Sequence, residues 1–114
     1  MTITRDVVTD TSYTRATGAV AIATTIAPGA PWPLEEIRVH LSAAGASGNL
    51  TATVDHAAGS AYDINILTQD MTSVTDLVWS PDSPMKFQSG DELDIAWANA
   101  GTKTYGLEVV WRLI

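Results

Sequence analysis

The sequence predicts an all-β protein, an antiparallel β-sandwich of about eight strands in a jelly-roll-like arrangement. Apolar residues recur at every second position in most of the chain, which is the period of a strand with one buried face. No convincing run shows the three- and four-residue spacing of an amphipathic helix. The composition agrees, because 15 Thr and 16 Ala stand against only 10 Lys, Arg and Glu.

The expected strands follow one another along the chain with turn residues between them. Alternation is clear at 20–26, 36–41, 50–55, 62–66, 92–97 and 107–113. Strands at a spacing of about 8 to 12 residues are typical of a sandwich or barrel. Segment 68–74 has no clear period and is compatible with one helical turn.

Turn residues indicate how these strands are joined. Turn residues lie at 45–49 (GASGN), 58–60 (AGS) and 99–102 (NAGT), and each segment predicts an antiparallel hairpin connection. The Pro-rich segments 28–33 and 80–84 predict surface crossings, since Pro lacks the N–H group that a central strand needs. Two long crossings among hairpins favour Greek-key connections over a meander.

The length of 114 residues predicts one domain, with residues 1–12 as an N-terminal arm or added edge strand and residues 13–114 as the sandwich. The first residues contain no apolar stretch of the signal-peptide kind, and no segment has the length of a membrane span. We therefore expect synthesis in the cytoplasm of the producing cell and no membrane association.

Charge and residue types narrow the function classes. A net charge of -7 disfavours a nucleic-acid binder, which needs clustered Lys and Arg. The two histidines, His40 and His56, fall on a polar strand face and in a turn, and no serine lies in a nucleophile motif. We expect no enzyme, and no catalytic, cofactor-binding or metal-ligating residues. A structural Ca²⁺ between loop aspartates stays open as a minor alternative, with candidates Asp55, Asp63, Asp70, Asp76 and Asp82.

The four tryptophans divide into two pairs. Trp97 and Trp111 are in phase with core positions of their strands, so we expect them in the core. Trp32 lies between two prolines and Trp79 precedes Ser80-Pro81. Both are candidates for an exposed platform on which a sugar ring stacks, the alternative function being a carbohydrate- or receptor-binding module.

The strand faces that point away from the predicted core carry small, weakly apolar residues, with alanines at 19, 21, 23, 96 and 98. A sheet that faces only water should be more polar, so we expect another chain or the N-terminal arm to cover part of these faces. The expected partner-contact residues are Thr2, Ile3, Thr4, Arg5 and Val7 of the arm, with Val110 and Ile114 of the last strand.

Several segments from Leu34 to Arg112 resemble small virion proteins of tailed bacteriophages. The resemblance is carried by the residues 33–37 (PLEEI), 61–63 (AYD), 79–82 (WSPD), 90–97 (GDELDIAW) and 104–109 (TYGLEV). It implies a β-sandwich accessory protein of the head decoration or cement type, often trimeric, with no catalytic residues. The expected partners are then a capsid protein and further copies of the chain, and the expected location is the capsid surface of the virion. Tail- and fibre-associated modules share similar sandwiches, so the position on the particle stays open.

Overall fold

The computed structural model describes residues 11–113 and confirms an antiparallel β-sandwich. Within these residues, nine strands are joined by turns and by a short 3-10 helix at Ser60–Tyr62. The strands are β1 (Thr11–Gly18), β2 (Ile22–Ile26), β3 (Trp32–Leu41), β4 (Asn49–Asp55), β5 (Ile64–Asp70), β6 (Asp76–Trp79), β7 (Met85–Phe87), β8 (Glu92–Trp97) and β9 (Tyr105–Arg112). Within the described residues no helix is long and apolar enough to cross a membrane.

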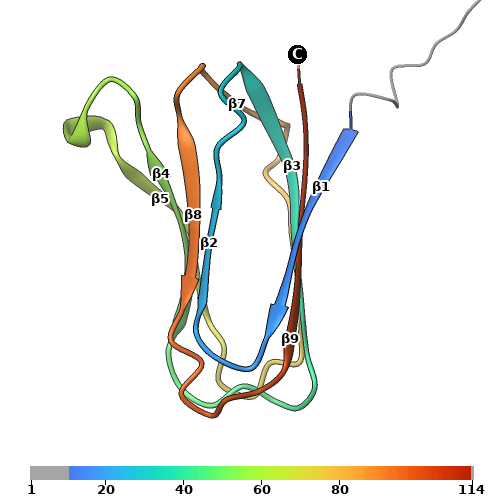
Figure 1. Cartoon of the computed structure of the whole chain (residues 1–114). Coiled ribbons are helices and arrows are strands. Elements are labelled where there is room, and N and C mark those ends of the chain that lie inside the picture. Colours follow the sequence, from blue (N-terminus) through green and yellow to red (C-terminus); the bar gives the residue numbers. More distant parts are fainter. Residues whose placement is uncertain (1–10, 114) are drawn as a thin grey trace, which may run out of the picture.

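The strands form two facing sheets, seen edge-on in Figure 1. One sheet has the order β1-β9-β3-β6, with β7 also paired to β3, and the other has the order β2-β8-β4-β5. All the strand pairs are antiparallel. Most consecutive strands alternate between the sheets, which gives the jelly-roll-like arrangement that the sequence predicted.

Two of the predicted hairpins are wrong. The turn segments 45–49 and 99–102 join β3 to β4 and β8 to β9, and each of these pairs is divided between the two sheets. They are therefore inter-sheet crossings. The prediction at 58–60 is confirmed, because β4 pairs with β5. Segment 68–74 holds the end of β5 and an irregular connection, with no helical turn.

The inward faces of both sheets form one core. It includes Trp97 of β8, 2 % exposed, as the sequence predicted, while Trp111 of β9 is partly buried and packs against it. Trp32 lies between Phe87 and Trp111, with ring centroids at 4.6 and 5.9 Å. Apolar burial of this kind is the main stabilising term in folding.

Of the predicted arm, Thr11 and Ser12 belong to the described residues. Both lie in β1, paired with Arg112 and Trp111, and β1 is an edge strand of the five-stranded sheet. The remainder of the arm, residues 1–10, lies outside the described residues, as does Ile114.

Candidate interaction surfaces

The outer face of the five-stranded sheet carries a continuous network of charges. Glu108, at the centre of β9, accepts hydrogen bonds from Arg15 at 2.6 Å and from Arg38 at 2.5 Å, and Arg38 also donates to Glu36. The Arg15 hydrogen bond, followed by that of Arg38, holds the pKa of the Glu108 carboxyl below its usual range. The hydrogen bond from Arg38 to Glu36, followed by that to Glu108, raises the pKa of Arg38 above its usual value. On this face the charges neutralise one another, so it presents little net charge to a partner.

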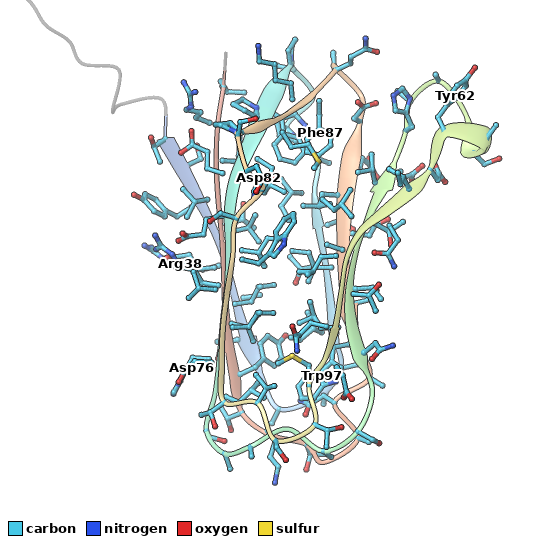
Figure 2. All side chains as sticks on the ribbon, turned by 180° about the vertical axis from the view of Figure 1, so that it is seen from behind. Arg38, Tyr62, Asp76, Asp82, Phe87 and Trp97 are labelled. Atoms are coloured by element: carbon cyan, nitrogen blue, oxygen red, sulfur yellow. The ribbon has the colours of Figure 1, made fainter. Side chains whose placement is uncertain are left out.

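A second pair extends this charged face along the sheet. His40 and Asp76 approach to 2.5 Å, and both side chains are mostly exposed. The side chains of Arg38 and Asp76 project outward from the sheet in Figure 2. Exposed pairs of this kind contribute little to stability.

Small residues line the outer face of the four-stranded sheet. Cross-strand neighbours form one row of Ala23, Ala96, Thr51 and Thr68 and a second row of Thr25, Asp94, Thr53 and Asn65. Ala23 and Ala96 are exposed there, while Ala19 and Ala21 fall in the connection before β2. Thr25 donates its hydroxyl to Asp94 on this face, and no ion pair within residues 11–113 crosses it.

The predicted contact residue Val110 does not offer the surface that was expected. It points to the outer face of β9 but is only 6 % exposed, because Tyr13 and Glu36 flank it in the neighbouring strands. The other predicted contacts, Thr2, Ile3, Thr4, Arg5, Val7 and Ile114, lie outside the described residues.

The prediction of an exposed aromatic platform at Trp32 is wrong. Trp32 begins β3 and its side chain is 0 % exposed, with its indole N–H directed at the Asp91 carbonyl oxygen at 3.4 Å. No face of this ring is open to a sugar. Trp79 is partly buried on the inward side of β6 and packs against the core.

The tip of the β4–β5 hairpin is the most prominent apolar projection of the described structure. Figure 1 shows the hairpin leaving the line of its sheet, and Figure 2 shows Tyr62 at its outer end. Tyr62 and Ile64 are 62 % and 59 % exposed, although the sequence pattern had both in phase with buried positions. Asp55 and Asp63 are exposed beside them, and residues 49–70 contain no Lys or Arg. We call residues 55–64 the hairpin tip.

Hydrogen bonds within and below the hairpin tip hold it in place. The Asp63 carboxylate accepts the His56 backbone N–H at 2.8 Å, and the His56 ring accepts the Ala58 N–H at 3.0 Å. The His56 and Tyr62 rings lie 5.6 Å apart. These contacts order the projecting segment in advance of any binding, which lowers the entropic cost of a contact.

Asp91 connects the hairpin tip to the body of the sandwich. Its carboxylate is 2 % exposed and accepts the backbone N–H groups of Ala57 at 2.9 Å and Gln88 at 2.8 Å. Burial by itself raises the pKa of this carboxyl, but the two N–H donors and nearby His56 outweigh it and lower the pKa below its usual value. The tip is thus fixed to the turn before β8.

A hollow of about 460 Å³ lies on the same end of the sandwich but on the five-stranded sheet. Its lining residues are Pro33, Ser83, Pro84, Lys86 and Arg112. Arg112 donates to Glu35, while no carboxylate within residues 11–113 lies at ion-pair distance from Lys86. We call it the basic hollow. A shallower hollow of about 420 Å³ lies over β1 and β9 beside Gly106, which has no side chain to fill it.

The histidines and loop aspartates are not gathered into a centre. Over residues 11–113, no three His, Cys, Asp or Glu side chains come close enough to hold a metal ion. The five candidate aspartates are divided among three connections: Asp55 and Asp63 flank β4–β5, Asp70 and Asp76 flank β5–β6, and Asp82 lies between β6 and β7. Asp70 instead accepts both the backbone N–H and the hydroxyl of Thr72, which lowers its pKa.

Comparisons with known proteins found no match to any family model, any curated protein or any solved structure.

Proposed function

We propose that the protein is a non-enzymatic structural component of a virion, a decoration or cement protein that binds a capsid surface and stabilises it through contacts between its own copies. The observation that carries this proposal is the anchored hairpin tip, where Tyr62 and Ile64 are exposed on an ordered projection. Large exposed apolar side chains on a rigid element are characteristic of protein–protein contacts.

The resemblance of several segments between Leu34 and Arg112 to small virion proteins of tailed bacteriophages supports the assignment to a capsid. On this proposal the partners are the capsid protein and further copies of the chain, with a trimer favoured, and neither nucleic acid nor a membrane is bound. The protein is made in the host cytoplasm and resides on the capsid surface.

Contact with a repeating lattice suits a domain of this size. A standard interface buries roughly 800 Å² on each partner, and weak contacts made at several places on one particle add up by avidity. The neutralised charged face and the flat row of Ala and Thr on the other sheet leave room for such contacts. The stabilisation of the capsid then comes from burial across the junctions between its subunits.

The alternative of carbohydrate binding depended mainly on an exposed Trp32, and Trp32 is inside the core. The exposed aromatic ring at Tyr62 keeps glycan binding as one outcome of the experiments below.

The test is a binding assay with capsids of the encoding phage assembled without the protein, followed by imaging. Uniform decoration at symmetry-related positions is the expected result, and no association at saturating concentration would refute the proposal. Tyr62→Ala combined with Ile64→Ser should reduce the occupancy of capsid sites. Val20→Ser, which removes an apolar side chain 70 % exposed in the β1–β2 connection, is the matched control.

A further inference from the structure

We infer that copies of this chain associate head-to-tail, with the hairpin tip of one copy seated in the basic hollow of the next. The inference deepens the oligomeric contact of the proposed function by naming its two surfaces. It rests on that proposal only for where the assembly occurs, since the contact itself follows from the chain's own residues.

The hairpin tip has the composition of an inserted element. Tyr62 and Ile64 form its apolar part, and the exposed carboxylates of Asp55 and Asp63 make it acidic. Its hydrogen bonds to Asp91 and within residues 56–63 fix its shape. A preformed projection with one aromatic residue at its end fits a pocket better than a flat surface.

The basic hollow has the complementary composition. Pro33 and Pro84 supply apolar walls, and Lys86 and Arg112 supply positive charge. Aromatic rings dock against proline, and cations at the rim of such a site favour both an aromatic face and a carboxylate. Its volume of about 460 Å³ is within the range of pockets that hold a compact organic group.

Of the five Lys and Arg side chains in residues 11–113, Lys86 and Arg112 line one hollow together, whereas Lys103 stands alone in the β8–β9 connection. Arg15 and Arg38 are both engaged by carboxylates on the charged face of their own copy. In the basic hollow, Arg112 binds Glu35 through its Nε. Within residues 11–113, no carboxylate lies at ion-pair distance from Lys86 or from the terminal nitrogens of Arg112. In a chain of net charge -7, a second copy is repelled from most approaches. When the acidic tip of one copy approaches the basic hollow of another, the opposite charges attract and offset this repulsion.

The fold prevents the hairpin tip from reaching the basic hollow of the same copy. The hairpin tip belongs to β4 and β5 of the four-stranded sheet, whereas the hollow belongs to β3, β7 and β9 of the other sheet. In Figure 1 the tip extends away from the sandwich on the side opposite to β3 and β9. A contact between two different surfaces is heterologous, so it produces a closed ring when the rotation between copies closes.

A mixing experiment tests the pairing. The tip variant carries Tyr62→Ala and Ile64→Ser, and the hollow variant carries Lys86→Glu. We expect the wild-type chain to associate with rising concentration in sedimentation velocity, and each variant alone to remain monomeric. An equimolar mixture should form dimers and no larger species, because the intact tip of the hollow variant meets the intact hollow of the tip variant.

Matched controls separate the contact from general effects. Lys103→Glu changes the net charge as Lys86→Glu does, but at the opposite end of the sandwich, and Val78→Ser removes exposed apolar surface from β6. Both should associate like the wild type, and urea unfolding of all the variants should give similar midpoints.

Three results would overturn the inference. The first is a wild-type chain that stays monomeric at every concentration. The second is a hollow variant that still associates, since this indicates tip-to-tip contact. The third is a glycan that binds the monomeric protein and is lost in the tip variant, which assigns Tyr62 to carbohydrate. Self-association without capsid decoration refutes the proposed capsid binding and leaves this pairing standing, because no capsid is present in the assay. Decoration by isolated monomers refutes this pairing and the contacts between copies, and leaves the proposed capsid binding standing.

Discussion

The carboxylate of Asp91, in the β7–β8 turn, accepts the backbone N–H of Ala57, in the β4–β5 connection, at 2.9 Å and across 34 residues of sequence. This bond joins the projecting β4–β5 hairpin to the turn before β8. Asp91 also accepts the Gln88 N–H, and its own carbonyl faces the Trp32 indole. One buried side chain thus couples the interaction surface to the core.

We expect Asp91→Ala to lower the free energy of unfolding by about 1–3 kcal/mol, because it removes the acceptor of two part-buried backbone N–H groups, those of Ala57 and Gln88. Urea unfolding measures the change. Asp91→Asn keeps one carbonyl acceptor and should cost less. Asp82→Ala, an exposed carboxylate in the β6–β7 connection, should remain within about 0.5 kcal/mol of the wild type. Equal effects at positions 82 and 91 would contradict the role given to Asp91.

The same carboxylate predicts a pH dependence. Its pKa is 3.8 when unfolded and lower when folded, so the unfolded state binds more protons between the two values. The contribution of Asp91 to stability is therefore present above about pH 4, and it is lost as the pH falls through the folded pKa. Urea midpoints measured from pH 6 to pH 2.5 should fall less steeply in Asp91→Asn than in the wild type. Asp70 and Glu108, whose pKa values are also lowered, are common to both proteins and cancel in the comparison.

The sequence predicted the strands well because alternation is a local property. Ile37, Val39 and Leu41 are buried while Arg38 and His40 are exposed, and in β8 the residues facing inward are likewise buried. In β9 the outward Val110 is also buried, which alternation does not predict. The assignment of turns to hairpins or crossings was less successful. Gly and Asn at 45–49 suit either connection, and the choice depends on which distant strand each neighbour pairs with.

The candidate surface was harder to predict, for two physical reasons. Tyr62 is in phase with Ile64 and Ile66, so alternation favoured burial, but a 3-10 turn removes Tyr62 from the strand. The register of β4 and β5 also shifts between Ala52 and Thr53. For Trp32 the error is the reverse, because the sequence predicted exposure and the side chain is buried. Its flanking prolines suggested a surface segment, yet β3 begins at Trp32 and pairs Pro33 with Lys86 of β7. One feature of the sequence does point to this surface: residues 49–70 are acidic and contain no Lys or Arg.

Trp32→Ala should cost about 3–5 kcal/mol of unfolding free energy, the range for a fully buried Trp truncated to Ala. The lost contacts are those with Phe87 and Trp111, and the loss should be visible in urea unfolding. Val78→Ala, at an exposed position, should change the free energy by less than about 0.5 kcal/mol. A Trp32→Ala protein with unchanged stability would contradict the placement of this ring in the core.

Two glycines provide a paired prediction about backbone packing. A Cβ atom on Gly45 would lie 2.2 Å from the Met71 carbonyl oxygen, and Gly45 exchanges backbone hydrogen bonds with the same loop through Val74 and Ser73. Because the obstacle is backbone, it cannot rotate away. We expect Gly45→Ala to destabilise the protein by about 1–3 kcal/mol, as overpacking in a tight region does.

Gly106 is the matched position on β9. A Cβ atom there meets nothing within 4 Å, and the backbone needs no left-handed conformation. Gly106→Ala should therefore leave the unfolding free energy unchanged or raise it by up to about 1 kcal/mol, because the unfolded chain loses freedom. It should also partly fill the shallow hollow between β1 and β9. Thermal and urea unfolding of the two variants side by side decide the matter. A stable Gly45→Ala protein would show that the β3–β4 crossing does not pass as close to Met71 as the structure places it.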